Sequence, residues 1–402
     1  MSDHAAPADD AADPRAARKW LDLAARLGLR GGGDVEPNPM VGAVLVKGGR
    51  LVGCGHHRRF GGPHAEREAL DDCSRRGETA SGATCYVTLE PCNHHGKQPP
   101  CAAALADAGV ARVVYARADP DPAAAGGARF LGARGVRCEQ SDASPLATGL
   151  AAPFAKRIAT GLPWVIAKWA QTIDGRIATR TGESKWISGA PARVRVHRLR
   201  ARVDAVLTGI GTVLADDPML TARDVSRVRR VARRVVADTD LDIPLTSALV
   251  RTAREWPTIV ACERSLTLVT FSARKRAAFD QAGVELLSVA DHAPGRGLDL
   301  RELLTLLARH HGVATVLVES GPGLLGSLFD DDLIDEAVVY VAPMLLGDEL
   351  ARSVAVGRVA ASLTQARRFR LCRVKRLGDD VELTYRREAV PATPAPGTAG
   401  QP

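Results

Sequence analysis

The chain has few aromatic residues and no long apolar run, and each absence excludes a class of protein. Aromatic residues make up 4% of the 402 residues, a poor supply of the stacking surfaces that proteins use to bind single-stranded nucleic acid. No segment approaches the roughly 18 to 20 consecutive apolar residues of a membrane-spanning helix, and the acidic, Ala-rich start is unlike a secretory signal. We therefore expect no nucleic-acid partner, no membrane partner and a cytoplasmic location.

Cysteine is also sparse, since eight residues are scattered over the whole length. Such a distribution does not form a dense disulfide framework, so reduced thiols, or a metal site where several converge, are expected. A chain of this length exceeds what one core usually serves and favours two domains. The net charge of +8 leaves two interpretations open, namely a solvated Arg-rich surface or a phosphate-bearing substrate.

Helical periodicity alternates with short Val-rich runs along most of the chain, and this pattern predicts layered α/β domains. The pattern weakens around residues 141–162, so we place a domain boundary near residue 150. We predict a disordered tail (1–14), a first domain (15–150), a second domain (160–388) and a flexible tail (389–402). The predicted strands are 41–46, 84–89, 111–116, 163–170, 204–210, 233–238, 257–262, 314–320 and 336–343, and the predicted helices are 15–29, 64–76, 101–108, 190–201 and 301–310.

Three residues of the first domain have the chemistry of a hydrolytic zinc site. Such a site needs three protein ligands and an open position for water. His64 follows Gly-Pro at a predicted helix start, Cys92 follows Pro91 at a second apparent helix start, and Cys101 follows two prolines. Zinc nucleobase deaminases carry H-x-E and then P-C-x-x-C, with the Glu as a proton shuttle rather than a ligand. We predict that His64, Cys92 and Cys101 bind Zn²⁺ and that Glu66 is catalytic.

The second cysteine of this pattern is displaced, because eight residues separate Cys92 from Cys101 where the common motif has two. Asn38, which comes directly before the first buried strand, has an amide that could bind the donor and acceptor edge of a ring. An Asx-turn explains the same residue equally well.

The runs PNPMVGAVLV, GGPHAE and YVTLEPCNHHGKQPPC resemble the N-terminal domain of the bifunctional riboflavin-biosynthesis deaminase-reductases, which belong to the cytidine deaminase-like family. The eight-residue gap is that family's own variant. Asn93 and Gln98 stand where its members more often have Ser and Thr. The resemblance implies a cytidine deaminase-like three-layer domain and makes Asn38 a substrate-binding residue.

The second half, from 163 to 346, resembles the reductase domain of the same family, whose fold is like dihydrofolate reductase and whose cofactor is NADPH. Ser320 replaces a more usual Gly. The resemblance implies NADPH contacts at Ala170, Trp186, Thr212, Asp216, Gly321, Pro322, Gly323, Leu324, Leu325, Gly326 and Ser327. It implies substrate contacts at Ser184, Arg200, Leu220, Arg223 and Glu319, with Arg200 and Arg223 as a clamp on a phosphate. Lys168, Asp216 and Glu319 are the candidates for proton delivery, and Lys168 and Asp216 are predicted to be catalytic.

Together these features predict a two-domain enzyme with Zn²⁺ and NADPH. It would deaminate 2,5-diamino-6-(5-phosphoribosylamino)pyrimidin-4-one and then reduce the ribosyl group to ribityl. The resemblance also implies a homo-oligomer assembled mainly through the reductase domains. Three alternatives stay open: the same chemistry in a secondary-metabolite pathway, a nucleic-acid editing deaminase with an RNA-binding second domain, and a degenerate scaffold or sensor.

Overall fold

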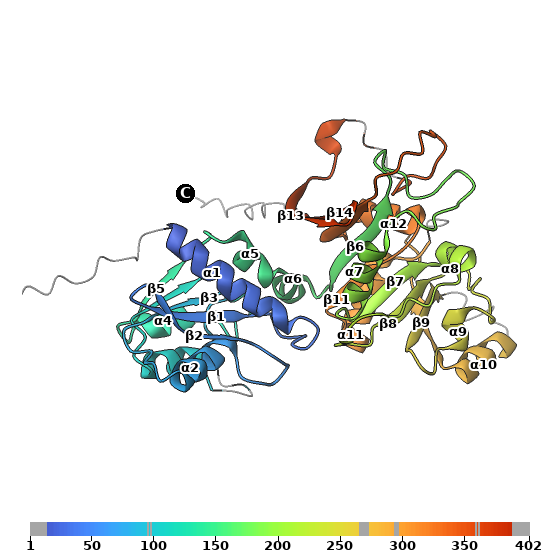
Figure 1. Cartoon of the computed structure of the whole chain (residues 1–402). Coiled ribbons are helices and arrows are strands. Elements are labelled where there is room, and N and C mark those ends of the chain that lie inside the picture. Colours follow the sequence, from blue (N-terminus) through green and yellow to red (C-terminus); the bar gives the residue numbers. More distant parts are fainter. Residues whose placement is uncertain are drawn as a thin grey trace, which may run out of the picture.

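The computed structural model of the chain describes residues 14–94, 96, 99–264, 273–292, 297–357, 360 and 362–387. The predicted tails lie outside these residues, except that Pro14 opens the first helix instead of ending a tail. Within the described residues, no helix is both long enough and apolar enough to cross a membrane. Two separate sheets, of five and nine strands, form the frames of two domains that lie side by side (Figure 1).

The first domain is a five-stranded sheet between two helical layers. Strands β1 and β2 form an antiparallel hairpin, and β3, β4 and β5 continue the sheet as parallel neighbours. The sheet order is β2 (Arg50–His56), β1 (Gly42–Lys47), β3 (Thr84–Val87), β4 (Arg112–Tyr115) and β5 (Arg137–Gln140). The helices are α1 (Pro14–Gly28), followed by the 3-10 turn η2 (Leu29–Gly31), α2 (Ala65–Arg75), α3 (Cys101–Asp107), α4 (Gly127–Gly132) and α5 (Pro145–Leu150).

Both faces of this sheet are covered because β1 is buried at every position except its last. Ala43 and Leu45 pack in one cluster with Ala69 of α2 and Leu105 of α3, whereas Val44 packs in another with α1 and α5. Successive side chains of a strand point to opposite faces, so a run that is apolar at every position requires apolar partners on both sides. The predicted three-layer α/β domain is therefore confirmed.

The second domain is built on the nine-stranded mixed sheet, with helices on both faces (Figure 1). Its sheet order is β10 (Val284–Val289), β9 (Thr258–Glu263), β8 (Arg233–Ala237), β7 (Ala205–Gly209), β11 (Thr315–Val318), β6 (Trp164–Gln171), β12 (Glu336–Val341), β14 (Asp380–Arg387) and β13 (Phe369–Leu377). Its helices are α7 (Ala190–Arg200), α8 (Ile210–Asp216), α9 (Ala248–Arg251), α10 (Ala273–Ala282), α11 (Leu300–His311), α12 (Pro322–Asp330) and the 3-10 turn η4 (Leu363–Gln365). Strands β6 to β12 are parallel, and β13 and β14 run antiparallel at one edge.

The two sheets are joined by helices in a region where the sequence pattern indicated only weakened periodicity. Helix α5 is capped by the Ser144 hydroxyl and packs in the α1 cluster. Helix α6 (Ala152–Thr160) follows and leads into β6, between the two domains (Figure 1). Short Ala-rich turns without a strong apolar stripe give little periodic signal, and tertiary contacts stabilise them here.

Candidate active sites

The predicted zinc ligands converge at the N-terminal ends of two helices. His64 is the residue immediately before α2, Glu66 lies in the first turn of α2, and Cys101 begins α3. Cys92 lies in the segment after β3, which is not helical, so the expectation of a helix start at Pro91-Cys92 was wrong. The neighbouring N–H of Asn93 donates to the Ala124 carbonyl at 2.9 Å, so this segment is held by a part of the chain that is distant in sequence.

The distances between the donor atoms fit a zinc ion. His64 Nδ1 lies 3.5 Å from Cys92 Sγ and 3.4 Å from Cys101 Sγ, and the three donor atoms lie within 4.8 Å of one another. Zinc bonds of about 2.3 Å to sulfur and 2.0–2.1 Å to nitrogen in a tetrahedron place N and S about 3.5 Å apart. The backbone N–H of Cys101 also points at Cys92 Sγ, at 3.4 Å, and supports a thiolate there. The three side chains therefore fit the ion.

The charges in this cluster suit a metal site with an acid–base group beside it. The pKa of Cys92 is lowered to about 4, first by the hydrogen bond from the Cys101 thiol and then by His64. Glu66 is 4% exposed, and burial, supported by the Cys92 charge, raises the pKa of its carboxyl group to about 7. A carboxyl group with a pKa near the working pH can both accept and return a proton.

A cavity of about 340 Å³ opens beside the cluster and contains Asn38, Glu66, His64 and Cys92 in its wall. His57 Nδ1 lies 2.9 Å from the Pro63 carbonyl, and since a carbonyl can only accept, this nitrogen carries the hydrogen. His57 Nε2 is then an acceptor for Asn38 Nδ2 at 3.3 Å. The bond fixes the orientation of the Asn38 amide, so its oxygen is free to receive a hydrogen bond from a ring.

The second cavity, of about 1170 Å³, lies in the other domain at the carboxyl ends of β6, β7 and β11. Ligands of open α/β sheets bind at this edge, outside the carboxyl ends of the strands. Lys168 comes from β6, Gly209 ends β7, and Glu319 directly follows β11. The volume exceeds the roughly 300 to 1,000 Å³ of a pocket for one drug-sized ligand, which suits a nucleotide cofactor together with a substrate.

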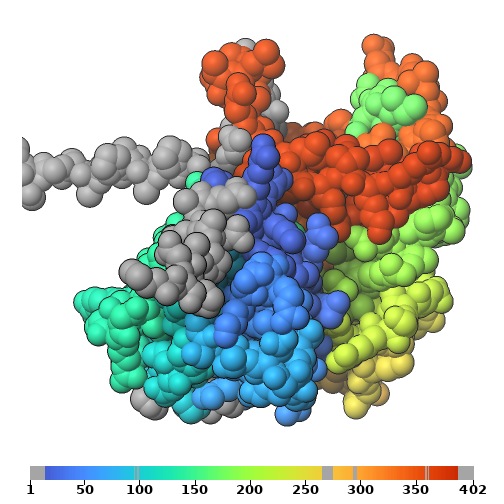
Figure 2. Space-filling view, turned by 60° about the vertical axis from the view of Figure 1, so that its left-hand side comes forward, coloured from blue at the N-terminus to red at the C-terminus, as the bar shows by residue number. Residues whose placement is uncertain are grey.

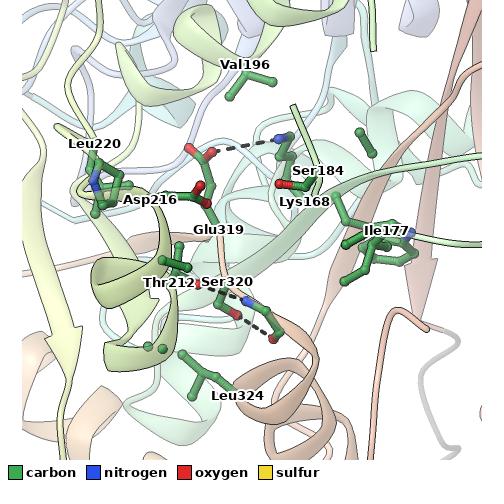
Figure 3. A pocket seen from close by; sticks show the side chains of 18 of the residues that line it. Lys168, Ile177, Ser184, Val196, Thr212, Asp216, Leu220, Glu319, Ser320 and Leu324 are labelled. Atoms are coloured by element: carbon green, nitrogen blue, oxygen red, sulfur yellow. Dashed lines mark hydrogen bonds and ion pairs between the residues drawn. The ribbon is translucent and has the colours of Figure 1, made fainter. Parts of the chain in front are cut away.

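Most residues predicted for this site line the same cavity, and Figure 3 shows several of them facing one another across it. Leu325 and Gly326 do not line it. Leu325 is fully buried in the core, and Gly326 lies so close to Val356 that an added Cβ would be 1.9 Å from the Val356 carbonyl oxygen. The predicted residues that do line the cavity are Lys168, Ala170, Ser184, Trp186, Arg200, Thr212, Asp216, Leu220, Arg223, Glu319, Gly321, Pro322, Gly323, Leu324 and Ser327.

A buried ion cluster forms one wall of the cavity. Arg200 binds the Glu319 carboxylate with both Nε and Nη2, at 2.6 and 2.9 Å. Lys168 Nζ lies 3.8 Å from the same carboxylate, and Figure 3 shows this pair. Burial alone would raise the pKa of Glu319, but Arg200 and Lys168 outweigh it and hold this pKa at about 2. Burial also lowers the pKa of Lys168, against the attraction of Glu319. Glu319 is therefore an anion that holds two cations in place.

The predicted cofactor loop, residues 321–327, is mostly the first turns of helix α12 (Pro322–Asp330), and its start is held by a contact with a second helix start. Thr212, in the first turn of α8, accepts a hydrogen bond from the Gly321 N–H at 3.1 Å (Figure 3). Gly321 immediately precedes α12, so the N-terminus of that helix faces the cavity. Asp216, at the end of α8, forms an ion pair with Lys185 at 2.9 Å. Trp186 is 64% exposed, and the Arg193 guanidinium covers its ring at 4.7 Å.

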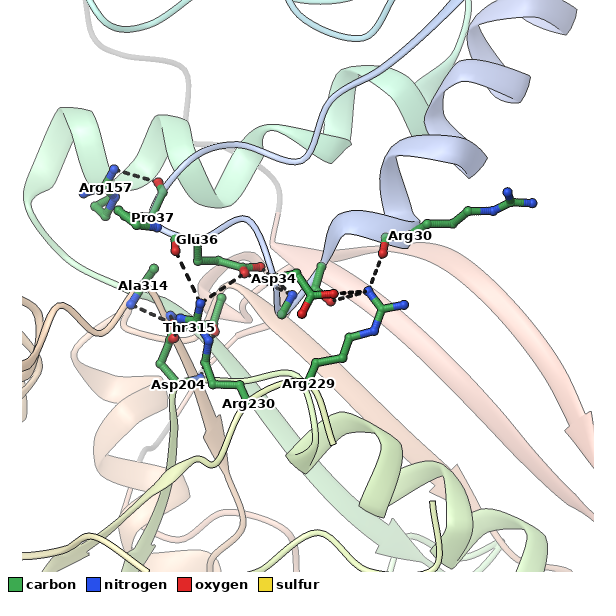
Figure 4. A network of polar contacts seen from close by, with 12 residues as sticks. Arg30, Asp34, Glu36, Pro37, Arg157, Asp204, Arg229, Arg230, Ala314 and Thr315 are labelled. Carbon is green, nitrogen blue, oxygen red and sulfur yellow. Dashed lines mark hydrogen bonds and ion pairs between the residues drawn. The ribbon is translucent and has the colours of Figure 1, made fainter. Parts of the chain in front are cut away.

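The loops that border the two cavities meet at the domain interface, where an ion network ties them together (Figure 4). Arg229 pairs with Asp34 at 3.2 Å. Arg230 binds Asp204 and the Glu36 carbonyl, the latter at 3.3 Å. Arg157 of α6 donates to the Pro37 carbonyl, next to Asn38, at 2.9 Å. In Figure 2 the blue residues of the first domain lie directly against the green and yellow residues of the second.

Several cavity residues were not found from the sequence. Asp119 lines the cavity beside the cysteines, and burial raises the pKa of its carboxyl group to about 6. The Asp-Pro-Asp run of residues 119–121, two residues after a predicted strand, was an available signal. Arg157 lines the same cavity from a helix that the pattern did not indicate, and His197 lines the cavity of the second domain. Gln98 lies outside the described residues, while Asn93 does not line the first cavity.

The fold and the two sites define a two-domain enzyme, with a zinc-binding, cytidine deaminase-like domain followed by a reductase domain. Two family descriptions match these halves. Residues 14–117 match the cytidine and deoxycytidylate deaminase zinc-binding region, and residues 163–383 match the RibD C-terminal domain.

Whole-length relatives carry the same arrangement. Riboflavin biosynthesis protein RibD of Actinobacillus pleuropneumoniae is 38% identical over 91% of this chain and 94% of its own length. RibD of Escherichia coli is 38% identical over 90% of this chain and 97% of its own length. The chain therefore belongs to the RibD family of riboflavin-biosynthesis proteins, enzymes with a zinc-dependent deaminase domain and an NADPH-dependent reductase domain.

Solved structures agree over most of the chain. Acinetobacter baumannii RibD superposes with a TM-score of 0.74 and 36% identity, covering 94% of this chain and all of that one. A diaminohydroxyphosphoribosylaminopyrimidine deaminase/5-amino-6-(5-phosphoribosylamino)uracil reductase of Thermotoga maritima superposes with a TM-score of 0.75 and 30% identity, covering 93% and 99%.

Proposed function

We propose that this chain carries out both reactions named for the Thermotoga relative on one phosphorylated pyrimidine. The first replaces an amino group of the diaminopyrimidine ring by oxygen, and the second reduces the ribosyl group to ribityl. The observation that carries the proposal is the N/S/S triad of His64, Cys92 and Cys101 beside buried Glu66, on the same chain as a second cavity of nucleotide size. The relatives do not favour an RNA-editing enzyme or a scaffold.

In the deaminase site, zinc held by His64, Cys92 and Cys101 would make water acidic enough to attack the ring at neutral pH. Glu66 accepts a proton from the attacking water and passes it to the leaving amino group, so that ammonia departs as the carbonyl forms. The raised pKa of Glu66 suits both transfers. Asn38, held by His57, orients the ring edge.

In the reductase site, NADPH would supply the hydride that reaches the first carbon of the sugar. The N-terminus of α12, with Gly321 just before the helix and Gly323 in its first turn, would bind its phosphate groups, because helix N-termini present free N–H groups to anions. Lys168, held by Glu319, delivers the proton that the sugar ring oxygen needs as the ring opens. Three N–H groups of Arg200 are occupied by Glu319 and the Thr221 carbonyl. We therefore assign the substrate phosphate chiefly to Arg223, which has no ion-pair partner among the described residues.

Ammonia release and NADPH oxidation test the two halves separately. Purified protein loaded with zinc should release ammonia from the substrate without NADPH, and Glu66→Ala should not. Glu68→Ala is the matched control, since Glu68 lies on the same helix but pairs with Arg58 at the surface, at 3.1 Å. NADPH should be oxidised only after deamination. Ammonia release by Glu66→Ala at the rate of Glu68→Ala would contradict the deaminase assignment, and unchanged NADPH would contradict the reductase assignment.

We further propose that the enzyme forms a homo-oligomer through the reductase domain. Strand β13 is an open edge whose side chains are largely exposed, including Leu371 at 49% and Val374 at 58%. Exposed edge strands with apolar side chains pair readily with another chain. The molar mass in solution of Val374→Glu should fall to that of one chain, whereas an unchanged mass would place the contact elsewhere.

A further inference from the structure

His197 lines the reductase cavity but has no part in the reaction described above. It lies in the last turn of α7, three residues before Arg200, so both side chains lie on the same face of the helix. The residue is 9% exposed, and of its two ring nitrogens only Nδ1 has a partner in the described part of the chain. Nε2 is not among the buried polar atoms that lack a partner, so it is open to the cavity.

The partner of Nδ1 determines which nitrogen carries the hydrogen. His197 Nδ1 lies 3.2 Å from the Thr221 carbonyl oxygen, and a carbonyl only accepts, so Nδ1 is the donor. In a neutral imidazole Nε2 then carries a lone pair. Burial lowers the pKa of His197, and so do Arg200 and Arg223, against the Thr221 bond and Glu319. The ring is therefore neutral at pH 7, with an acceptor at Nε2.

The charged groups that act on the ring are two cations and one anion. Arg200 and Arg223 are the cations, and both oxygens of the anion, Glu319, are engaged by Arg200. An uncharged acceptor beside them is poorly suited to a phosphate, whose oxygens also accept. It is well suited to a hydroxyl group, which needs an acceptor for its hydrogen.

We propose that His197 Nε2 accepts a hydrogen bond from a hydroxyl group on the ribose chain of the substrate and so makes the reductase selective for a hydroxylated sugar. The inference rests on the proposed function, because it concerns the substrate of that site. A site built to bind a hydroxyl group disfavours an analogue without it, since its own polar group is then left unpaired.

A purely structural role must be separated from this one. The Thr221 carbonyl accepts hydrogen bonds from both His197 and Arg200, the latter at 3.0 Å. These bonds hold the segment that carries Leu220, whose backbone φ is 52°, and Arg223. Loss of the Nδ1 bond would loosen this segment and slow the reaction for every substrate, whether or not it has the hydroxyl group.

Two substitutions divide the two roles of the ring. In His197→Asn the amide N–H can replace Nδ1 and keep the Thr221 bond, but nothing replaces Nε2. In His197→Gln the longer side chain can place its oxygen near the Nε2 position, while the Thr221 bond is lost. His310→Asn is the control on an exposed histidine far along the sequence.

The measurement is kcat/KM for NADPH oxidation with the deaminated substrate and with its 2′-deoxy and 3′-deoxy analogues. The wild type should discriminate against at least one analogue by about tenfold, the value of one hydrogen bond. His197→Asn should lose that discrimination, His197→Gln should keep it at a lower overall rate, and His310→Asn should match the wild type. Binding of NADPH to each variant checks that the reductase domain, which carries His197, is folded.

Discrimination by His197→Asn equal to that of the wild type for both analogues overturns the proposal. A measurement on the wild type alone gives a second check. The ¹⁵N resonance of His197 Nε2 should shift when the parent compound binds and not when the discriminated analogue binds, and equal shifts would also overturn it. Failure of the wild type to oxidise NADPH with the parent compound would instead contradict the proposed function.

Discussion

A methyl group added at Gly127 tests whether the packing behind the zinc site positions its ligands. Gly127 begins α4, and a Cβ built there would lie 1.8 Å from the Pro91 carbonyl oxygen and 2.9 Å from the Pro91 carbonyl carbon. Real Cβ contacts are essentially never shorter than 3.0 Å. Backbone atoms must therefore separate by about 1.2 Å in Gly127→Ala, and Pro91 is bonded directly to Cys92, the proposed zinc ligand.

The expected magnitude follows from two opposing effects. Overpacking costs about 1 to 3 kcal/mol, while replacing Gly by Ala inside a helix contributes up to about 1 kcal/mol. The free energy of unfolding of the deaminase domain should therefore fall by up to about 2 kcal/mol. Zinc sites tolerate ligand displacements of only about 0.2 Å, so we expect zinc affinity to fall by about 10- to 100-fold.

The assay is zinc content per chain after dialysis against a competing chelator, followed by ammonia release. Gly132→Ala is the matched control, because Gly132 lies in the same helix and a Cβ there meets nothing within 4 Å. It should be neutral or slightly stabilising. NADPH oxidation with deaminated substrate should be normal in both variants. Zinc affinity in Gly127→Ala equal to that in Gly132→Ala would refute the reasoning.

Three further substitutions test other parts of the chain. Glu66→Gln should reduce ammonia release by about 10²- to 10⁴-fold while zinc content per chain is unchanged, and equal rates would remove its role as proton shuttle. Glu319→Gln should destabilise the reductase domain by about 3 to 5 kcal/mol, because it leaves buried Arg200 and Lys168 without their anion. The pKa of Glu319 is lowered from 4.5 to about 2, so its contribution is present above pH 4.5 and lost as the pH falls toward 2; chemical denaturation across this range should show this loss in the wild type only. In Gly326→Ala the added Cβ would lie 1.9 Å from the Val356 carbonyl oxygen. This variant should raise KM for NADPH without changing ammonia release, and an unchanged KM would show that the Gly326–Val356 contact does not affect cofactor binding.

The zinc site could be predicted from sequence because its chemistry depends on residue types at short spacings. His64 and Glu66 belong to one helix start, and Cys101 begins a helix that the apolar pattern also indicated. The sequence pattern does not predict the packing that positions Cys92. That segment is held by the Ala124 carbonyl and by the close approach of Gly127, and both contacts join residues that are distant in sequence.

The reductase site was predictable only in part, for a physical reason. Glycine-rich turns after strands indicate a nucleotide loop, and the structure places most of that loop at the cavity. The role of Glu319 depends on Arg200, which comes from another helix over a hundred residues earlier in the chain. Ion pairs between residues distant in sequence produce no periodic pattern. The resemblance therefore implied that Arg200 binds a phosphate, whereas the structure shows it bound to the Glu319 carboxylate.

The pairing of Arg200 with a carboxylate bears on whether the positive net charge indicates an anionic partner. A net charge of +8 is compatible with an anionic partner, but many arginines in this chain are used inside the protein. Arg230, which pairs with Asp204 of its own domain, donates across the interface to the Glu36 carbonyl. Fully buried Arg234 donates to the carbonyls of Leu249 and Trp256, each at 3.0 Å. Arginine serves such positions because its planar fork can satisfy several acceptors at once. The net charge of the chain therefore does not indicate a phosphate-binding site, and the proposed one depends on charges local to the cavity.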